Sequence, residues 1–137
     1  MLYFSLAKFL TGVIGPFCYS SYTVQNADEF KERLVNFRDS LPVGSVLTEV
    51  SYDVESLFTN IPLDDTIDKL VNKIFREVDT YKFKDVVFTP ESLKQALILC
   101  AKDQLFLFND KIWLQTDGNS MGSPLGPPLT IFYVSFI

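Results

Sequence analysis

Apolar residues recur every three or four positions along several stretches of the chain, which is the pattern of an amphipathic helix. This spacing predicts helices over residues 6–17 and 26–40 and a third helix that starts at residue 63. The apolar face of the third helix consists of Leu63, Ile67, Leu70, Val71, Ile74, Phe75 and Val78. A fourth helix is predicted to start at Thr89 and Pro90, which suit a cap and a first helical position.

The predicted helix over residues 26–40 carries its own start and stop signals. Asn26 and Glu29 have the spacing of a capping box, in which each side chain satisfies the other residue's backbone amide. Pro42 and Gly44 follow the helix and end it. The residues that share its apolar face are Phe30, Leu34 and Phe37.

Two stretches have the character of β-structure. Residues 46–52 are β-branched and aromatic and predict a strand with Asp53 at its carboxyl end. Residues 106–113 predict two short strands joined at Asn109 and Asp110. Residues 118–127 are too rich in Gly and Pro for regular structure, and an apolar helix or strand follows them. This order of elements predicts an α+β fold.

Composition narrows the classes of function. With 137 residues and 47% hydrophobic residues, the chain is long and apolar enough for one domain with a real core, and it is not a disordered tail. The chain has no histidine, which excludes Ser-His-Asp catalysis and zinc sites built on histidine. Its two cysteines, Cys18 and Cys100, are expected to be reduced thiols in the core.

The charge of the chain is acidic and unevenly distributed. The chain has seventeen acidic and twelve basic residues, so its net charge of −5 argues against a free-standing nucleic-acid binder. Both ends are nearly uncharged: residues 1–23 contain only Lys8 and residues 112–137 contain only Asp117. The N-terminal run lacks the features of a signal peptide and is broken by Gly and Pro, so we expect a buried helix and no membrane. A weaker alternative to a buried helix is a membrane-associated domain that uses its apolar ends.

Two segments are candidates for chemistry. An aspartate at the end of a strand, such as Asp53, can hold Mg²⁺ together with a neighbouring carbonyl, although such an aspartate can equally be a turn or helix cap. In the loop 118–127, Gly118, Gly122 and Gly126 let backbone approach a ligand, and Ser120 and Ser123 offer hydroxyl groups. The loop can equally be a tight connection, and it lacks the Gly-Lys-Ser/Thr ending of a phosphate-binding P-loop.

Taken together, the two segments resemble two active-site motifs of reverse transcriptases. The sequence YDVESLFTNIP at residues 52–62 and the sequence DGNSMGSPLGP at residues 117–127 occur in the order and at the separation of that family. The resemblance extends over nearly the whole chain and is strongest to the polymerase domain of Penelope-like retroelements. It implies a polymerase palm, with helices packed on a small antiparallel sheet, over residues 1–137.

The resemblance also implies roles for individual residues. Asp53 matches the catalytic aspartate that binds two Mg²⁺ ions, the Val54 backbone carbonyl contacts one of them, and Phe58 matches the gate that selects deoxynucleotides. The residues that match the motif beside the incoming nucleotide and template base are Gly118, Met121, Gly122, Ser123 and Pro124. The implied reaction is RNA-directed DNA synthesis by two-metal nucleotidyl transfer. The implied partners are an RNA template, a DNA primer and deoxynucleotides. The setting implied by the family is intracellular, and the sequence leaves open whether it is the nucleus.

The sequence departs from the family in ways that affect activity. No aromatic-x-Asp-Asp motif follows the glycine loop, and the one adjacent pair, Asp64 and Asp65, opens a predicted helix. Most of the fingers and the thumb are also missing. We therefore expect a partial palm that is inactive on its own, whose complete protein is an enzyme. The alternative is a catalytically dead remnant of a retroelement that acts as an interaction module. Asn119, Pro128 and Thr130 are smaller departures.

Overall fold

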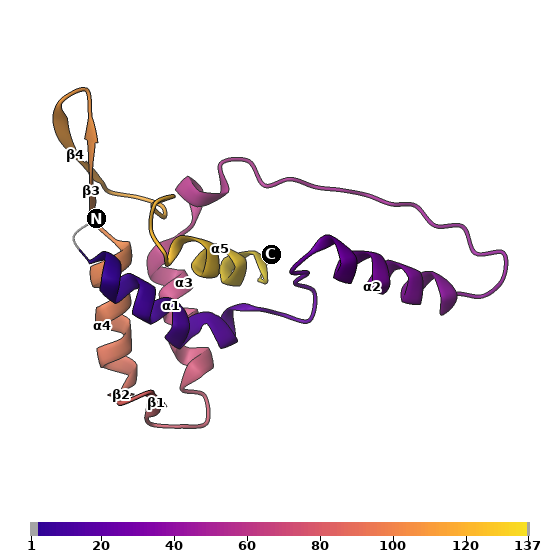
Figure 1. Ribbon diagram of the computed structural model, residues 1–137, viewed down its shortest axis with the longest axis horizontal. Helices are drawn as coiled ribbons and strands as arrows, with labels where there is room; N and C mark the ends of the chain where they lie inside the picture. Colours follow the sequence, from indigo (N-terminus) through magenta and orange to yellow (C-terminus); the bar gives the residue numbers. More distant parts are fainter. Residues whose placement is uncertain (1–2, 137) are drawn as a thin grey trace.

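The computed structural model describes residues 3–136, which form five α-helices, one 3-10 helix and two antiparallel hairpins (Figure 1). The helices are α1 (Phe4–Cys18), α2 (Ala27–Asp39), α3 (Leu63–Ile74), α4 (Pro90–Ala101) and α5 (Gly126–Val134), with the 3-10 helix η1 at Leu57–Asn60. The strands are β1 (Tyr81–Phe83), β2 (Val86–Phe88), β3 (Gln104–Phe108) and β4 (Lys111–Gln115). The mixed α+β class is confirmed.

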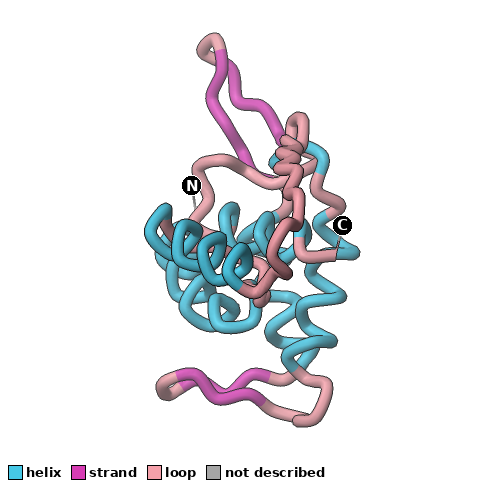
Figure 2. Tube along the Cα trace, turned by 90° about the vertical axis from the view of Figure 1, so that its right-hand side faces the viewer, coloured by secondary structure: helices cyan, strands magenta, loops and turns pink. Residues whose placement is uncertain are grey.

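Helices α1, α3, α4 and α5 pack together and form the hydrophobic core (Figures 1 and 2). Most apolar side chains of these helices point inward because burying them is the main stabilising contribution. Side chains with no exposed surface include Leu10, Val13, Ile14, Ile67, Leu70, Leu93, Leu97, Leu129 and Phe132. The predicted helix over residues 6–17 is confirmed as α1. Both cysteines are buried free thiols, as predicted.

The ends of the helices follow mostly from local side-chain bonds. The Thr89 hydroxyl accepts a hydrogen bond from the Ser92 amide, and the Ser92 hydroxyl accepts one from the Thr89 amide, so α4 starts in a complete capping box. The predicted box at α2 forms only in part. Asn26 accepts from the Glu29 amide at 2.9 Å, but the Glu29 carboxylate accepts from the amide of Gln25 and not from that of Asn26.

The two hairpins lie at opposite ends of the helical core (Figure 2). The predicted hairpin is confirmed as β3–β4, with Asn109 and Asp110 at φ +53° and +58° in a turn that matches the twist of a two-residue hairpin. The β1–β2 hairpin was not predicted. It is attached to α1 through aromatic contacts, with the Phe17 and Tyr81 ring centroids 5.4 Å apart.

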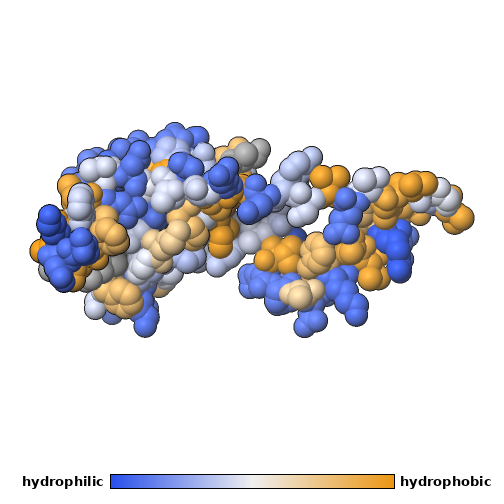
Figure 3. Space-filling model, turned by 90° about the horizontal axis from the view of Figure 1, so that it is seen from above, coloured by the Kyte–Doolittle hydropathy of each residue, from blue (hydrophilic) through white to orange (hydrophobic). Residues whose placement is uncertain are grey.

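Residues 19–56 leave the core as an arm that consists of a linker, α2 and a long extended segment (Figures 1 and 3). The predicted strand over residues 46–52 is wrong: this segment has no regular secondary structure and pairs with no described strand. Val46, Val50 and Tyr52 are 92%, 60% and 91% exposed. A strand gains most of its stability from cross-strand pairs, so a β-prone sequence without a neighbour stays irregular.

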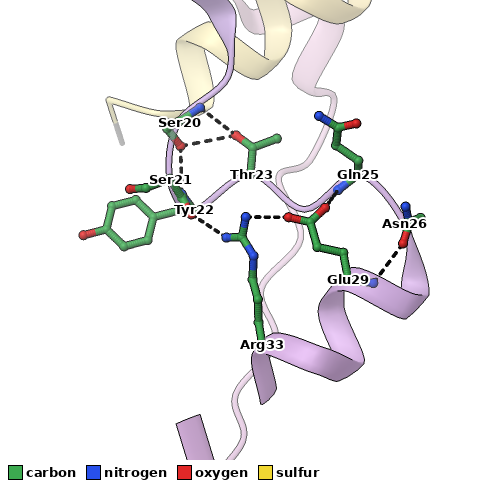
Figure 4. A network of polar contacts seen from close by, with 8 residues as sticks. All are labelled: Ser20, Ser21, Tyr22, Thr23, Gln25, Asn26, Glu29 and Arg33. Atoms are coloured by element: carbon green, nitrogen blue, oxygen red, sulfur yellow. Dashed lines mark hydrogen bonds and ion pairs between the residues drawn. The ribbon is translucent and has the colours of Figure 1, made fainter. Parts of the chain in front are cut away.

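The arm helix α2 has the predicted apolar stripe, but none of its residues is buried. Phe30, Leu34 and Phe37 are each about half exposed. The helix is held at its start by polar contacts, in which Arg33 donates to the Ser21 carbonyl and pairs with the Glu29 carboxylate (Figure 4). Local hydrogen bonds and not core packing therefore fix how the linker enters α2.

Within residues 3–136, no helix combines the length and the apolar character needed to cross a lipid bilayer.

Candidate functional site

The two segments singled out in the sequence lie against each other. The Asn119 amide donates a hydrogen bond to the Phe58 carbonyl at 2.6 Å. At Gly118 the chain passes so close to η1 that an added Cβ atom would lie 2.5 Å from the Thr59 carbonyl oxygen. Gly118 also has φ +71°, which disfavours any residue with a side chain. A glycine is therefore required at residue 118 for this contact.

The position of Phe58 is set by the turn that contains it. Ser56 is left-handed at φ +51° and starts η1, and its carbonyl accepts from the amides of Thr59 and Asn60. This turn brings the half-buried Phe58 ring to Gly126, where an added Cβ atom would lie 3.6 Å from the ring edge. The Phe58 ring therefore lies against the end of the glycine loop.

Asn119 is a polar residue that joins the two segments, although in the sequence it stands out only as a departure from the reverse transcriptase motif. Its side chain is buried, and the side-chain nitrogen Nδ2 donates to the Gly126 carbonyl at 3.0 Å. The Asn119 side-chain oxygen has no hydrogen-bond partner among the described residues. The signal available in the sequence was an asparagine inside a glycine-rich turn, which is a common place for side-chain to backbone bonds.

The remaining loop residues fall into a buried and an exposed group. The buried Ser123 hydroxyl accepts from the Leu125 amide at 3.2 Å, and the half-buried Pro124 offers its carbonyl to the Thr11 hydroxyl at 3.0 Å. Met121 is 76% exposed, and an added Cβ atom at Gly122 would meet nothing within 4 Å. The loop thus has an inner side that supports the fold and an outer side, at residues 121 and 122, that is open to a ligand.

Asp53 and Val54 lie outside this contact, in the extended part of the arm that leads to η1. Both are exposed, and the Asp53 carboxylate takes part in none of the hydrogen bonds or ion pairs between described residues. Residues 3–136 also contain no group of three or more acidic or cysteine side chains that could hold a metal ion. Asp53 is therefore an isolated carboxylate among the described residues, which by themselves do not provide the donor set of a two-metal site.

An acidic hollow of about 310 Å³ opens beside the glycine loop, at the start of α3. Its lining includes Asp64, Asp65, Asp103 and Asp117, with Lys102 as its one basic residue. Lys102 is bound to the Asp64 carboxylate at 2.7 Å, and this hydrogen bond raises the pKa of the lysine. The excess of carboxylates disfavours phosphate groups in this hollow unless a cation accompanies them. The pair Asp64–Asp65 lies in the first turn of α3, as predicted.

A second hollow, of about 480 Å³, lies between the start of the arm, η1 and α5. Leu57, Ile131 and Val134 make it mainly apolar, and Thr130 also lines it. The Thr130 hydroxyl is buried and has no partner among the described residues. This hollow therefore lies next to the turn that carries Phe58, and it suits an apolar group better than a charged one.

Comparison of the chain with models of protein families, with curated proteins and with solved structures gives no match.

Proposed function

We propose that this chain is the central part of the polymerase domain of a reverse transcriptase, of the Penelope-like kind, and that the complete protein copies RNA into DNA. The observation that carries the proposal is the contact between the segments 52–62 and 117–127, through the Asn119–Phe58 hydrogen bond and the approach of Gly118 to Thr59. Segments that contribute to one active site must lie together, and these two do so although some sixty residues separate them. In this proposal the α+β fold is a partial polymerase palm.

In this proposal Asp53 and the Val54 carbonyl are Mg²⁺ ligands, because hard cations prefer oxygen donors. Their exposure leaves them accessible to an ion and to substrate. When bound, two such ions activate the primer hydroxyl and stabilise the leaving pyrophosphate. The other carboxylates would come from an aromatic-x-Asp-Asp motif elsewhere in the complete protein, so we expect no synthesis by residues 1–137 alone.

The role proposed for Phe58 is to select deoxynucleotides. Its ring is half-buried and its backbone is fixed by η1 and by the bond to Asn119. A ring held in this way cannot move aside easily, which is what exclusion of a ribose 2′-hydroxyl requires. In the glycine loop, Met121 and Gly122 are the residues left free to meet a nucleotide and a template base, and Gly118 and Ser123 support them.

The test uses the longest reading frame that contains this chain. We expect it to encode an aromatic-x-Asp-Asp motif after residue 137 and to yield a protein that extends a primer on an RNA template with Mg²⁺. Asp53→Asn should reduce the rate by at least about 100-fold, because a neutral amide binds a divalent cation poorly. Asp85→Asn, at an exposed position between β1 and β2, is the matched control and should leave the rate unchanged.

Two results would contradict the proposal. Undiminished synthesis by the Asp53→Asn protein would refute the assignment of Asp53 as a metal ligand. A reading frame closed by a stop codon or frameshift, together with no synthesis, would instead favour the non-catalytic remnant that acts as an interaction module.

A further inference from the structure

Asn119 is bonded to both partners of the contact between Phe58 and α5. Its backbone amide donates to the Phe58 carbonyl at 2.6 Å and so holds the residue that carries the ring. Its side-chain nitrogen Nδ2 donates to the carbonyl of Gly126, the first residue of α5, at 3.0 Å. The Phe58 ring lies against this same glycine. The ring and the surface on which it rests are therefore joined through one residue.

The contact between the ring and α5 is tight. A Cβ atom at Gly126 would lie 3.6 Å from the edge of the Phe58 ring and 3.1 Å from the Ser120 carbonyl oxygen. The Gly126 amide is bonded in turn to the Ser123 carbonyl at 2.9 Å. Because the ring touches the bare backbone of Gly126, a shift of α5 relative to the loop changes the surface against which the ring rests.

The amide side chain of Asn119 suits this place chemically. Its Nδ2 group is a donor that carries no charge, and the Gly126 carbonyl is an acceptor. The residue is 1% exposed, and its Oδ1 atom has no hydrogen-bond partner among the described residues. An unpaired buried acceptor costs stability, and an apolar side chain would avoid that cost. The bond from Nδ2 to Gly126 is therefore what asparagine contributes here and an apolar residue could not.

The other close contact of the loop does not perform this task. The approach of Gly118 to Thr59 joins the loop to η1 and does not involve α5. Among the side-chain hydrogen bonds between described residues, the bond from Asn119 is the one that joins residues 118–122 to α5. The place of the ring relative to α5 therefore depends on the Asn119 side chain.

We propose that Asn119 is a positioning residue for the selection of deoxynucleotides, because its two hydrogen bonds hold the Phe58 ring against the start of α5. This inference rests on the proposed function, in which Phe58 excludes the ribose 2′-hydroxyl. Asn119 is buried and acts through the ring, without contact to the nucleotide. When the bond to Gly126 is lost, the ring can tilt and leave room for the hydroxyl group.

The first test uses the 137-residue chain and needs no catalysis. In a chain with isotope-labelled phenylalanine and glycine, we expect a nuclear Overhauser effect between the Phe58 ring protons and the Gly126 Hα atoms. Phe58→Leu identifies the ring signals. Asn119→Ala should lose the effect. Ser92→Ala removes a cap bond of α4 at the end of the core that carries the β1–β2 hairpin, so this control should keep it (Figure 1).

The second test uses the longer protein that the proposed function requires. It compares kcat/KM for a deoxynucleotide with kcat/KM for the matching ribonucleotide on the same protein, so that the folded fraction cancels in the ratio. Asn119→Ala should lower this ratio about fivefold, which corresponds to one ordinary hydrogen bond. In a Phe58→Ala background the same change should have less than about a twofold effect, because no ring is left to position. A role in folding alone would leave the ratio unchanged.

The outcomes separate this inference from the proposed function. Asn119→Ser, whose side chain ends one bond short of Nδ2, replaces the alanine variant in both tests if that variant does not fold. An unchanged nuclear Overhauser effect, an unchanged ratio, or an equal fall of the ratio in both backgrounds would overturn the positioning role. A ratio that Phe58→Ala itself leaves unchanged, or a longer protein without synthesis, would refute the proposed function, and the role of Asn119 in nucleotide selection with it.

Discussion

The close approach of Gly118 to η1 makes a strong prediction about stability. In Gly118→Ala the new Cβ atom would lie 2.5 Å from the Thr59 carbonyl oxygen and 2.6 Å from the Thr59 Cα atom. Neither neighbour is the flexible end of a side chain, so the backbone of the loop or of η1 has to move. We expect the variant to separate the two candidate site segments.

The size of the effect follows from two contributions. A residue with a side chain in the left-handed conformation costs about 1–2 kcal/mol. Moving the loop also breaks the bond from the Asn119 amide to the Phe58 carbonyl, and a buried polar group left without a partner costs about 1–3 kcal/mol. The sum is about 3 kcal/mol. In a domain of this length that corresponds to a fall in Tm of roughly 10 °C.

The measurement is urea and thermal unfolding followed by far-UV circular dichroism. Gly122→Ala is the matched control in the same loop, since a Cβ atom there meets nothing within 4 Å and the residue has no left-handed φ. We expect this control to stay within about 0.5 kcal/mol of the wild type. Equal stability of the two variants would refute the contact between Gly118 and η1.

Three further predictions concern the rest of the chain. Gly15→Ala, at an open position inside α1, should raise the free energy of unfolding by about 0.5–1 kcal/mol in urea titrations, and a loss would show that the position is crowded. Burial raises the pKa of Cys18 to about 12, with Lys73 opposing the shift, so this thiol should not react with a disulfide reagent at pH 8 until urea unfolds the chain; fast reaction of the native protein would contradict its burial. Two contacts lower the pKa of Glu29 below its ordinary 4.5: the hydrogen bond from the Gln25 amide, which has the larger effect, and the bond to an arginine. The Gln25 contact therefore stabilises the folded chain above pH 4.5, and this stabilisation is lost as the pH falls through the lowered pKa. Hydrogen exchange at the Gln25 amide, corrected for its intrinsic rate, should then lose protection in acid in the wild type and show no such step in Glu29→Gln.

The arm connects the fold to the proposed function. Residues 46–52 are β-prone and lead directly to Asp53, yet they lie unpaired in this chain. If the complete protein has a polymerase palm, residues 46–52 must form one of its strands. A strand forms when a neighbouring strand supplies its hydrogen bonds. Secondary structure of this segment, measured in the chain and in the longer protein, would therefore test the palm independently of activity.

Much of the secondary structure could be predicted because its causes are local. The apolar stripes of α1 and α3, the Thr89 cap of α4 and the turn at Asn109 and Asp110 depend on residues a few positions apart, and all of them formed. The apolar face predicted for α3 was too long, because the helix ends at Ile74 and Val78 lies beyond that end. Helix ends of this kind depend on what the last turn packs against.

The candidate site was predictable in its parts and not in its contact. The sequence indicated the glycine loop and Phe58, but the bond between Asn119 and the Phe58 carbonyl depends on how α5 and η1 meet the core. The sequence also gave no means to see that Gly118 approaches backbone and not a ligand in this chain.

The amino-acid pattern alone determined that the stretches of α1, α2, α3 and α4 become helices, and it determined where α4 is capped. For the stretch of α5 it left a helix or a strand open. Tertiary structure alone decided whether the apolar faces of these helices were covered, and the face of α2 was not. It also decided that residues 46–52 do not form a strand. The physical reason is the same in both cases: a helix closes its hydrogen bonds within itself, whereas a strand or an apolar face is completed only by a neighbour that the local sequence does not specify.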